Sequence, residues 1–366
     1  MANLLIKGNN IQALNSLLEN RKLKGKIDLV YIDPPFATNG TFTITDGRAS
    51  TISNSRNGDI AYSDKLIGKE FIEYLRERLI LLKELLSEQG SIYLHIDYKI
   101  GHYVKVMMDE VFGIENFRND ITRIKCNPKN FDRIGYGNIK DLILFYTKSS
   151  KPIWNEPREK YTEKDIENLF SKIDKQGRRY TTVPIHAPGE TEKGKSNQPF
   201  KGIMPPKGRH WRTDVETLEQ CDKEGLIEWS STGNPRKIIF ADEREGKRVQ
   251  DVWEYKDPQY PTYPTEKNPE LLDLIVRTSS NPDSIVLDCF CGSGTTLKSA
   301  QINGRKWIGI DQSEYALKAT IEKLETIKGD LFAPKPEYEF IELEKILTEE
   351  TPNKSFKRTA KKPAAA

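Results

Sequence analysis

The strongest constraint on the fold is an apolar segment followed by two closely spaced glycines. Residues 284 to 290 are mainly apolar, which predicts a strand. Gly292 and Gly294 allow a tight turn and a close approach of the backbone to a ligand, and a helical pattern follows them. A second predicted strand, residues 306 to 310, ends at Asp311. This order of strand, turn, helix, strand and acid predicts an α/β domain in which Asp311 binds the ribose of a nucleoside cofactor.

The glycine pattern also limits the kind of cofactor. A dinucleotide-binding turn carries a third glycine, and the residues after Gly294 are Thr295, Thr296 and Leu297. The missing glycine disfavours nicotinamide and flavin cofactors. It leaves a cofactor without a pyrophosphate group as the prediction.

A second motif, near the N-terminus, can hold a planar amine. The apolar run of residues 27 to 32 predicts a strand that leads directly into Asp33, Pro34, Pro35 and Phe36. Neither proline has an N–H group, so the turn can present free carbonyl acceptors beside the Asp33 carboxylate. An exocyclic amine needs two acceptors, and Phe36 could stack on its ring. Taken alone, the motif fits a purely structural rigid turn equally well.

Together, these motifs resemble those of the S-adenosylmethionine-dependent DNA amino-methyltransferases of the β group. In that family a Phe-x-Gly-x-Gly loop binds the cofactor, an Asp-Pro-Pro-Tyr/Phe turn holds the target amine, and the catalytic half comes first. Residues 263 to 272 are similar to the family segment His-Pro-Thr-Gln-Lys-Pro. The resemblance implies a catalytic role for Asp33, Pro34, Pro35 and Phe36. It implies cofactor contacts from Asn9, Pro264, Thr265, Lys267, Asp288, Phe290, Gly292, Ser293, Gly294, Thr295 and Asp311.

The resemblance covers about residues 3 to 325 and implies the fold. The expected architecture is a circularly permuted, Rossmann-like methyltransferase domain with a mixed, mostly parallel sheet of the seven-stranded type and helices on both faces. Its catalytic half is expected at 1–150, a target-recognition insert at 151–257 and its cofactor-binding half at 258–330. Residues 331–366 form a C-terminal extension, expected to be disordered from about residue 349.

Basic residues, prolines, glycines and aromatic residues are interleaved in the predicted insert. Lys and Arg suit phosphate contacts, and Arg also reads base edges. An irregular, solvated insert with ordinary surface charges is the alternative. The residues predicted to contact DNA are Arg123, Lys125, Arg178, Arg179, Arg209 and Arg212.

Two features of the catalytic half concern the target base. Residues 37 to 62 lack an apolar period and directly follow the catalytic turn, so we predict a loop that closes over an extruded base. Phe131, Tyr136 or the guanidinium of Arg123 is expected to stack on that base. His95, in a predicted strand without an obvious nucleophile or metal partner, is interpreted as a structural residue.

Composition adds few limits. The 366 residues suffice for an α/β core with an insert, and the formal net charge of only +3 means that DNA binding must rely on local basic clusters. The four cysteines form no Cys-x-x-Cys pair, so no metal site is predicted. No apolar run approaches the length of a membrane span. These observations predict a cytoplasmic protein.

The predicted activity is sequence-specific methylation of adenine N6 in double-stranded DNA, with S-adenosyl-L-methionine as cofactor. In the resembled family Asp at the first turn position is usual for adenine enzymes, whereas Ser is commoner in cytosine-N4 enzymes. Cytosine N4, an RNA base or a protein amide are alternative targets, and a catalytically idle DNA-binding module is a further alternative. The resemblance also suggests a restriction-modification system with a cognate endonuclease, and a homodimer is a further predicted arrangement.

Overall fold

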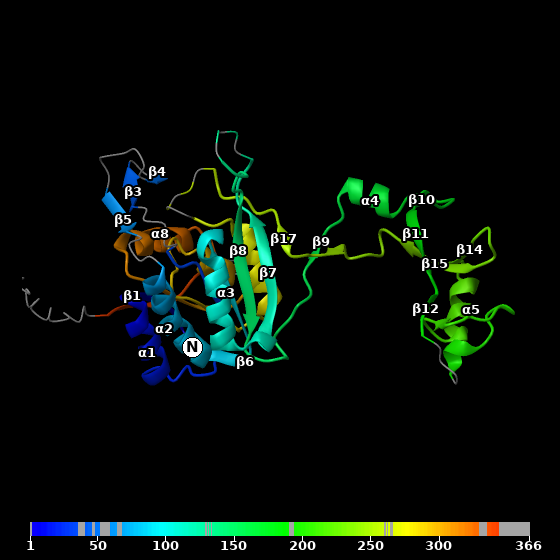
Figure 1. The fold of residues 1–366 in the computed structure, drawn as a ribbon, viewed down its shortest axis with the longest axis horizontal. Coiled ribbons are helices and arrows are strands. Elements are labelled where there is room, and N and C mark those ends of the chain that lie inside the picture. Colours follow the sequence, from blue (N-terminus) through cyan, green and yellow to red (C-terminus); the bar gives the residue numbers. More distant parts are fainter. Residues whose placement is uncertain are drawn as a thin grey trace, which may run out of the picture. The chain divides into compact units, whose positions relative to one another are not determined.

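The computed structural model describes two compact units (Figure 1). The first contains the described residues up to Asn155 and from Gln250 onward, and the second is Glu156–Val249. The described ranges are 2–35, 41–45, 48–51, 59–63, 68–128, 130, 132, 134–189, 194–259, 261, 263, 266–328 and 335–343, with the backbone alone described between 41 and 63.

A mixed sheet forms the centre of the first unit. In the described part of the chain it has nine strands, and all of them run parallel except β8. The strand order is β17 (Val252–Trp253), β7 (Phe117–Ile124), β8 (Lys140–Thr147), β6 (Leu86–Ile96), β2 (Ile27–Ile32), β18 (Ile285–Asp288), β19 (Lys306–Asp311), β1 (Asn3–Lys7) and β20 (Tyr338–Glu342). The predicted fold class is confirmed, with the short strand β17 and the C-terminal strand β20 added at the edges of the expected seven.

Helices cover both faces of this sheet (Figure 1). One face carries α1 (Asn10–Glu19), α2 (Lys69–Leu85) and α3 (Tyr98–Phe112), which is followed by the short helix η1 (Ile114–Asn116). The other carries α6 (Pro269–Ser279), α7 (Thr295–Ile302) and α8 (Glu314–Glu325). The apolar stripes of α1, α2 and α3 pack with buried strand residues in one core, because each helix has leucine, valine or methionine at helical spacing.

The connections place the switch point of the sheet, where a ligand crevice is expected, between β2 and β18. From β2 the chain continues through α2 to β6 on one side, and from β18 it continues through α7 to β19 on the other side. The two strands are parallel neighbours, with Val286 opposite Leu29 and Leu287 opposite Val30. A reversal of strand order at the carboxyl ends of such strands is where open α/β sheets bind ligands.

The helix α2 ends at Leu85, and Gly90 lies within β6, where an added Cβ would be 2.9 Å from the backbone oxygen of Ile27. One local prediction in the first unit is wrong. The segment 37–62 is not a continuous loop, because β3 (Thr41–Thr45) pairs with β4 (Arg48–Thr51) and β5 (Asp59–Ser63). The Asp-Gly dipeptide between β3 and β4 was the missed hairpin signal.

The second unit is more regular than the sequence predicted. Its four-stranded antiparallel sheet has the order β10 (Lys172–Ile173), β11 (Arg179–Pro184), β15 (Pro235–Phe240) and β14 (Ile227–Trp229). Its other elements are β9 (Arg158–Glu159), α4 (Glu163–Leu169), β12 (His186–Pro188), η2 (Lys195–Asn197), β13 (Arg209–Trp211), α5 (Val215–Lys223) and β16 (Lys247–Arg248). A small core around Phe200 and Trp211 stabilises it. The strands are two to six residues long, too short for a clear period.

Candidate active site

The predicted catalytic turn begins where β2 leaves the core. β2 is almost entirely buried, and Asp33 is the first residue after its end at the ligand crevice. Asp33 Oδ2 accepts a hydrogen bond from the ammonium group of Lys267. Asp33 Oδ1 is buried and has no hydrogen-bond partner among the described residues. A buried carboxylate oxygen without a donor is unfavourable, so this atom is well placed to receive an N–H group from a ligand. Phe36 and Phe131 lie outside the described residues.

The glycine turn has the left-handed backbone that its sequence requires. Gly292 has φ 51° and Gly294 has φ 74°, and α7 begins immediately afterwards at Thr295. An added Cβ at Gly294 would lie 2.7 Å from Thr320 Cγ2, so both conformation and space exclude a side chain there. At Gly292 the nearest atom to such a Cβ is Tyr263 Cε1 at 3.6 Å, so only the conformation favours glycine.

Two carboxylates flank this turn at the ends of their strands. Asp311 Oδ2 accepts from the Gly292 N–H at 3.0 Å, and Oδ1 accepts from the Ser313 N–H at 2.9 Å. Burial raises the pKa of Asp311, and burial raises the pKa of Asp288 to about 7. Asp288 Oδ1 accepts from the Phe290 N–H at 3.0 Å. Each Asp311 oxygen can accept a further bond, so the pair of oxygens fits ribose hydroxyls beside the open glycine turn.

The segment containing Glu266 and Lys267 contacts both halves of the site. Lys267 holds Asp33, whereas Glu266 Oε1 accepts from Lys323 Nζ at 2.5 Å. Lys323 Nζ also donates to Ser293 Oγ at 2.9 Å and to Thr295 Oγ1 at 2.8 Å. Burial lowers the pKa of Lys323. Two consecutive side chains therefore fix the Asp33 carboxylate and the start of α7, while the cofactor role predicted for Lys267 stays a prediction.

Three further residues predicted to bind the cofactor are Asn9, Pro264 and Thr265. Asn9 is exposed and caps α1, because its side chain accepts from the Ile11 N–H at 2.9 Å. Its neighbour Asn10 lies closer to the glycine turn, since its Nδ2 donates to the Cys289 oxygen at 3.2 Å and its Oδ1 accepts from Arg78 Nε at 2.7 Å. Pro264 and Thr265 lie outside the described residues.

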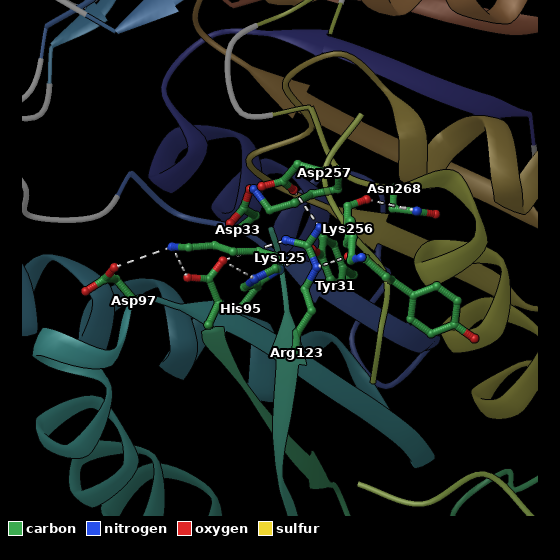
Figure 2. Close-up of polar contacts among 12 residues, drawn as sticks. Tyr31, Asp33, His95, Asp97, Arg123, Lys125, Lys256, Asp257 and Asn268 are labelled. Carbon is green, nitrogen blue, oxygen red and sulfur yellow. Dashed lines mark hydrogen bonds and ion pairs between the residues drawn. The ribbon is translucent and has the colours of Figure 1, made fainter. Parts of the chain in front are cut away.

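A buried polar network extends from β2 across the neighbouring strands (Figure 2). Tyr31 Oη lies 3.0 Å from His95 Nδ1, and His95 Nε2 lies 3.3 Å from Asp141 Oδ2. Burial lowers the pKa of His95, which favours the neutral imidazole. Lys125 Nζ donates to Asp141 Oδ1 at 2.5 Å. The structural interpretation of His95 therefore agrees with its position, because both ring nitrogens have partners.

Arg123 belongs to the same network, which corrects the prediction that it contacts DNA or stacks on the target base. Its side chain is fully buried. Its Nε donates to the Tyr255 backbone oxygen at 2.8 Å, and its Nη2 pairs with Asp257 at 2.5 Å (Figure 2). A guanidinium buried among these acceptors connects β7 to the segment after β17. Lys125 keeps a partly exposed side chain, and its DNA contact stays a prediction.

The four arginines of the second unit differ in their surroundings. Arg178 forms ion pairs with Asp242 and Glu243, both at 2.8 Å, so its charge is already balanced. Arg179 is half-buried in β11. Arg209 and Arg212 are exposed, and Arg209 Nη1 lies 3.1 Å from His186 Nδ1. Arg209 and Arg212 are thus the better candidates for phosphate contacts.

Comparison with known proteins identifies the chain. Residues 27–322 match the N6_N4_Mtase family, described as DNA methylase. The chain belongs to this DNA methylase family. It is 40% identical over 329 residues to the type II methyltransferase M.EcaI of Enterobacter cloacae, covering 88% of this chain and 69% of that protein.

Two further similarities are more distant. The chain is 24% identical to the StyLTI Mod subunit, a type III restriction-modification protein of Salmonella typhimurium, over 80% of this chain and 49% of that subunit. The solved M1.HpyAVI–SAM complex is 16% identical and aligns with 88% of this chain and 98% of that one, with a TM-score of 0.46. The family match and the 40% identity to M.EcaI make the chain a DNA methyltransferase of the S-adenosylmethionine-dependent kind. None of the helices in the described ranges combines the length and apolar character that a membrane crossing requires.

Several site residues were not predicted. Lys323, Asn10 and Arg78 support the cofactor half, and Asp141 and Asp257 anchor the network beside the catalytic strand. Lys323 lies at helical spacing on α8 and resembles an ordinary surface lysine in sequence. No local pattern distinguishes it, because its partners are 28 to 57 residues away.

The cofactor half leads to a direct prediction. Asp311→Ala is expected to weaken S-adenosylmethionine binding by about 1.5–3 kcal/mol, because ribose hydroxyls lose a charged acceptor. Titration calorimetry measures the affinity, and thermal unfolding checks that the glycine turn survives. Glu314→Ala is the control, since it removes a nearby carboxylate whose side chain is mostly exposed. Equal affinity of Asp311→Ala and wild type would exclude the ribose contact.

Proposed function

We propose that this DNA methylase transfers a methyl group to the N6 atom of adenine in a specific sequence of double-stranded DNA. The observation that carries the proposal is the buried, unpartnered Asp33 Oδ1 at the crevice between β2 and β18. It is an acceptor, next to the predicted cofactor turn, that lacks a donor among the described residues. Aspartate at this turn position is also usual for adenine enzymes of the resembled family.

The residues on each side of the crevice have distinct tasks in this mechanism. S-adenosyl-L-methionine, when bound, supplies the methyl group. The left-handed Gly292 and Gly294 shape the turn whose backbone would contact the cofactor, and Asp311 would accept hydrogen bonds from the ribose hydroxyls. The target adenine has to leave the base stack, since its amine cannot reach the crevice from within a duplex.

Asp33 prepares the amine for reaction. An aromatic amine is a weak nucleophile because its lone pair is delocalised into the ring. Asp33 Oδ1 and the Pro34 carbonyl accept hydrogen bonds from its two N–H groups, which localises the lone pair and stabilises the positive charge that develops on nitrogen. One of these protons then leaves the methylated nitrogen for Asp33 or for water. Lys267 holds the other carboxylate oxygen and so limits rotation of the group. Phe36 is proposed to hold the base ring.

Modified-base sequencing tests this function. DNA from a host that lacks its own methyltransferases would be sequenced after expression of the chain, and N6-methyladenine within one recurring sequence is expected. N4-methylcytosine would replace the adenine assignment with the cytosine alternative. Absence of any modified DNA base, with methyl groups found in RNA or protein, would contradict the proposal.

The second unit is proposed as the DNA-recognition part. Its support is the position of the insert in the chain and the exposed Arg209 and Arg212. We also propose a cognate restriction endonuclease and a homodimer, which fit a restriction-modification role. DNA as substrate also implies the cytoplasm as the place of action.

A salt titration distinguishes arginines of this unit that contact DNA phosphates from an arginine whose charge is already paired within the protein. The double variant Arg209→Gln and Arg212→Gln is expected to bind DNA more weakly, with a shallower dependence of log affinity on log salt. The slope should fall by about 0.9 for each phosphate that the variant no longer neutralises. Arg178→Gln is the matched control, because its guanidinium is already paired with Asp242 and Glu243. A double variant with the wild-type slope would place the DNA-binding surface elsewhere.

A further inference from the structure

The loop between β7 and β8 leaves the sheet at the same edge as the catalytic turn. β7 is antiparallel to β8, β8 is antiparallel to β6, and β6 is parallel to β2. The carboxyl ends of β7 and β2 therefore lie at one edge, so the segment after Ile124 begins on the side where Asp33 lies. Figure 1 shows this loop rising beyond the ends of β7 and β8.

The base of the loop is held firmly. The Lys125 N–H donates to the Ile139 oxygen at 2.8 Å, and Lys125 Nζ donates to Asp141. Lys256 Nζ donates to Asn127 Oδ1 at 2.7 Å, which connects the loop to the segment after β17. These contacts fix the direction in which the loop leaves the sheet.

The far part of the loop carries two apolar side chains in solvent. Ile134 is 105% exposed and Tyr136 is 99% exposed, against 69% for Ile114 and 68% for Tyr103, both elsewhere in the first unit. Gly135 lies between them with φ 117°, a conformation that glycine favours. Single exposed apolar residues are ordinary, but two fully exposed ones on a loop with an anchored base indicate a binding partner.

The partner that fits these features is duplex DNA. Residues 125–140 contain four basic side chains and one acidic side chain, Asp132, which favours a polyanion. Extrusion of a base leaves a gap in the stack at the edge of the sheet where the catalytic turn lies. Apolar side chains that enter DNA between bases replace part of the lost stacking. A second copy of the chain would not need basic residues on this loop.

We propose that Ile134 and Tyr136 form a wedge that enters the duplex and fills the space left by the extruded base. The proposal rests on the proposed DNA methylation. In this proposal Tyr136 enters the space that the extruded base has left in the duplex. The sequence instead made Tyr136 a candidate to stack on the extruded base itself. In this role the wedge stabilises the open duplex and does not touch the reacting atoms.

The test compares paired and unpaired target bases. The double variant Ile134→Ser and Tyr136→Ser would be assayed by single-turnover transfer of a labelled methyl group to a duplex containing the mapped target site. A second duplex carries a mismatch opposite the target base, so that extruding the base costs less free energy. On the paired duplex we expect a loss of about tenfold to a hundredfold, which corresponds to lost stacking. On the mismatched duplex the variant should come within about threefold of wild type, because an unpaired base is easier to extrude.

Ile114→Ser and Tyr103→Ser provide the matched control, since they change the same residue types at other exposed positions. This control should retain the wild-type rate on both duplexes. An unchanged rate for the wedge variant on paired DNA would contradict the proposal, as would an equal loss on both duplexes or an equal loss in the control. Wild-type protein that methylates neither duplex would contradict the proposed function and the wedge with it.

Discussion

Asp33→Ala is expected to lower single-turnover methyl transfer to DNA about a hundredfold to a thousandfold. The carboxylate acts on charge that develops mainly in the transition state, so its loss should affect the chemical step far more than binding. Asp33 Oδ1, buried without a donor among the described residues, is the atom to which the target amine would donate. Labelled methyl transfer, cofactor calorimetry and DNA binding would be measured on the same preparation.

Two further variants make this test specific. Asp33→Asn keeps the shape and one acceptor but loses the charge, so its rate should lie between those of wild type and alanine. Asp28→Ala removes another carboxylate of β2, one that accepts from Ser87 Oγ at 2.8 Å, and should retain near wild-type turnover. Near wild-type transfer by Asp33→Ala would mean that the turn is only structural.

The second large effect is expected at Lys267, whose ammonium group pairs with Asp33 Oδ2. Lys267→Met should reduce turnover about tenfold to a hundredfold, because a carboxylate that loses its partner no longer holds the amine in a reactive position. Lys267→Arg should retain most of the activity, since it restores a charged donor. Turnover and the Michaelis constant for the cofactor would be determined for each variant.

These two constants distinguish a positioning role from the cofactor contact that the sequence suggested. A positioning residue lowers turnover and leaves the Michaelis constant for the cofactor nearly unchanged. A higher constant with normal turnover in Lys267→Met would instead support the direct cofactor contact. Thermal unfolding would accompany both, because breaking a buried ion pair can also destabilise the fold.

The fold and the main site elements were predictable because their signals are local. The apolar run of β2 and the two glycines before α7 each specify a backbone conformation within a few residues. The parallel pairing of β2 with β18 then brings Asp33 and the glycine turn to one crevice. This placement can be predicted from the order of the motifs along the chain, because open α/β sheets bind ligands where the strand order reverses.

The partners of the site residues could not be predicted, because they are distant in sequence. Lys267 and Asp33 are 234 residues apart, and Arg123 and Asp257 are 134 residues apart. Local sequence marks Arg123 only as a basic residue in a strand, so a buried guanidinium and a DNA-facing one look alike. The same limit applies to the second unit, whose small core around Trp211 joins short strands without a period.

The most direct test of the central claim is nucleoside analysis of methylated DNA. We would incubate purified protein with labelled S-adenosylmethionine and duplex DNA that contains the mapped site. The DNA would then be digested to nucleosides, which are separated by chromatography and identified by mass. With the wild-type protein we predict label in N6-methyldeoxyadenosine. With Asp33→Ala the rate of labelling should be about a hundredfold to a thousandfold lower. Label in N4-methyldeoxycytidine, or equal label in wild type and Asp33→Ala, would contradict the assignment of Asp33 as the group that prepares adenine N6.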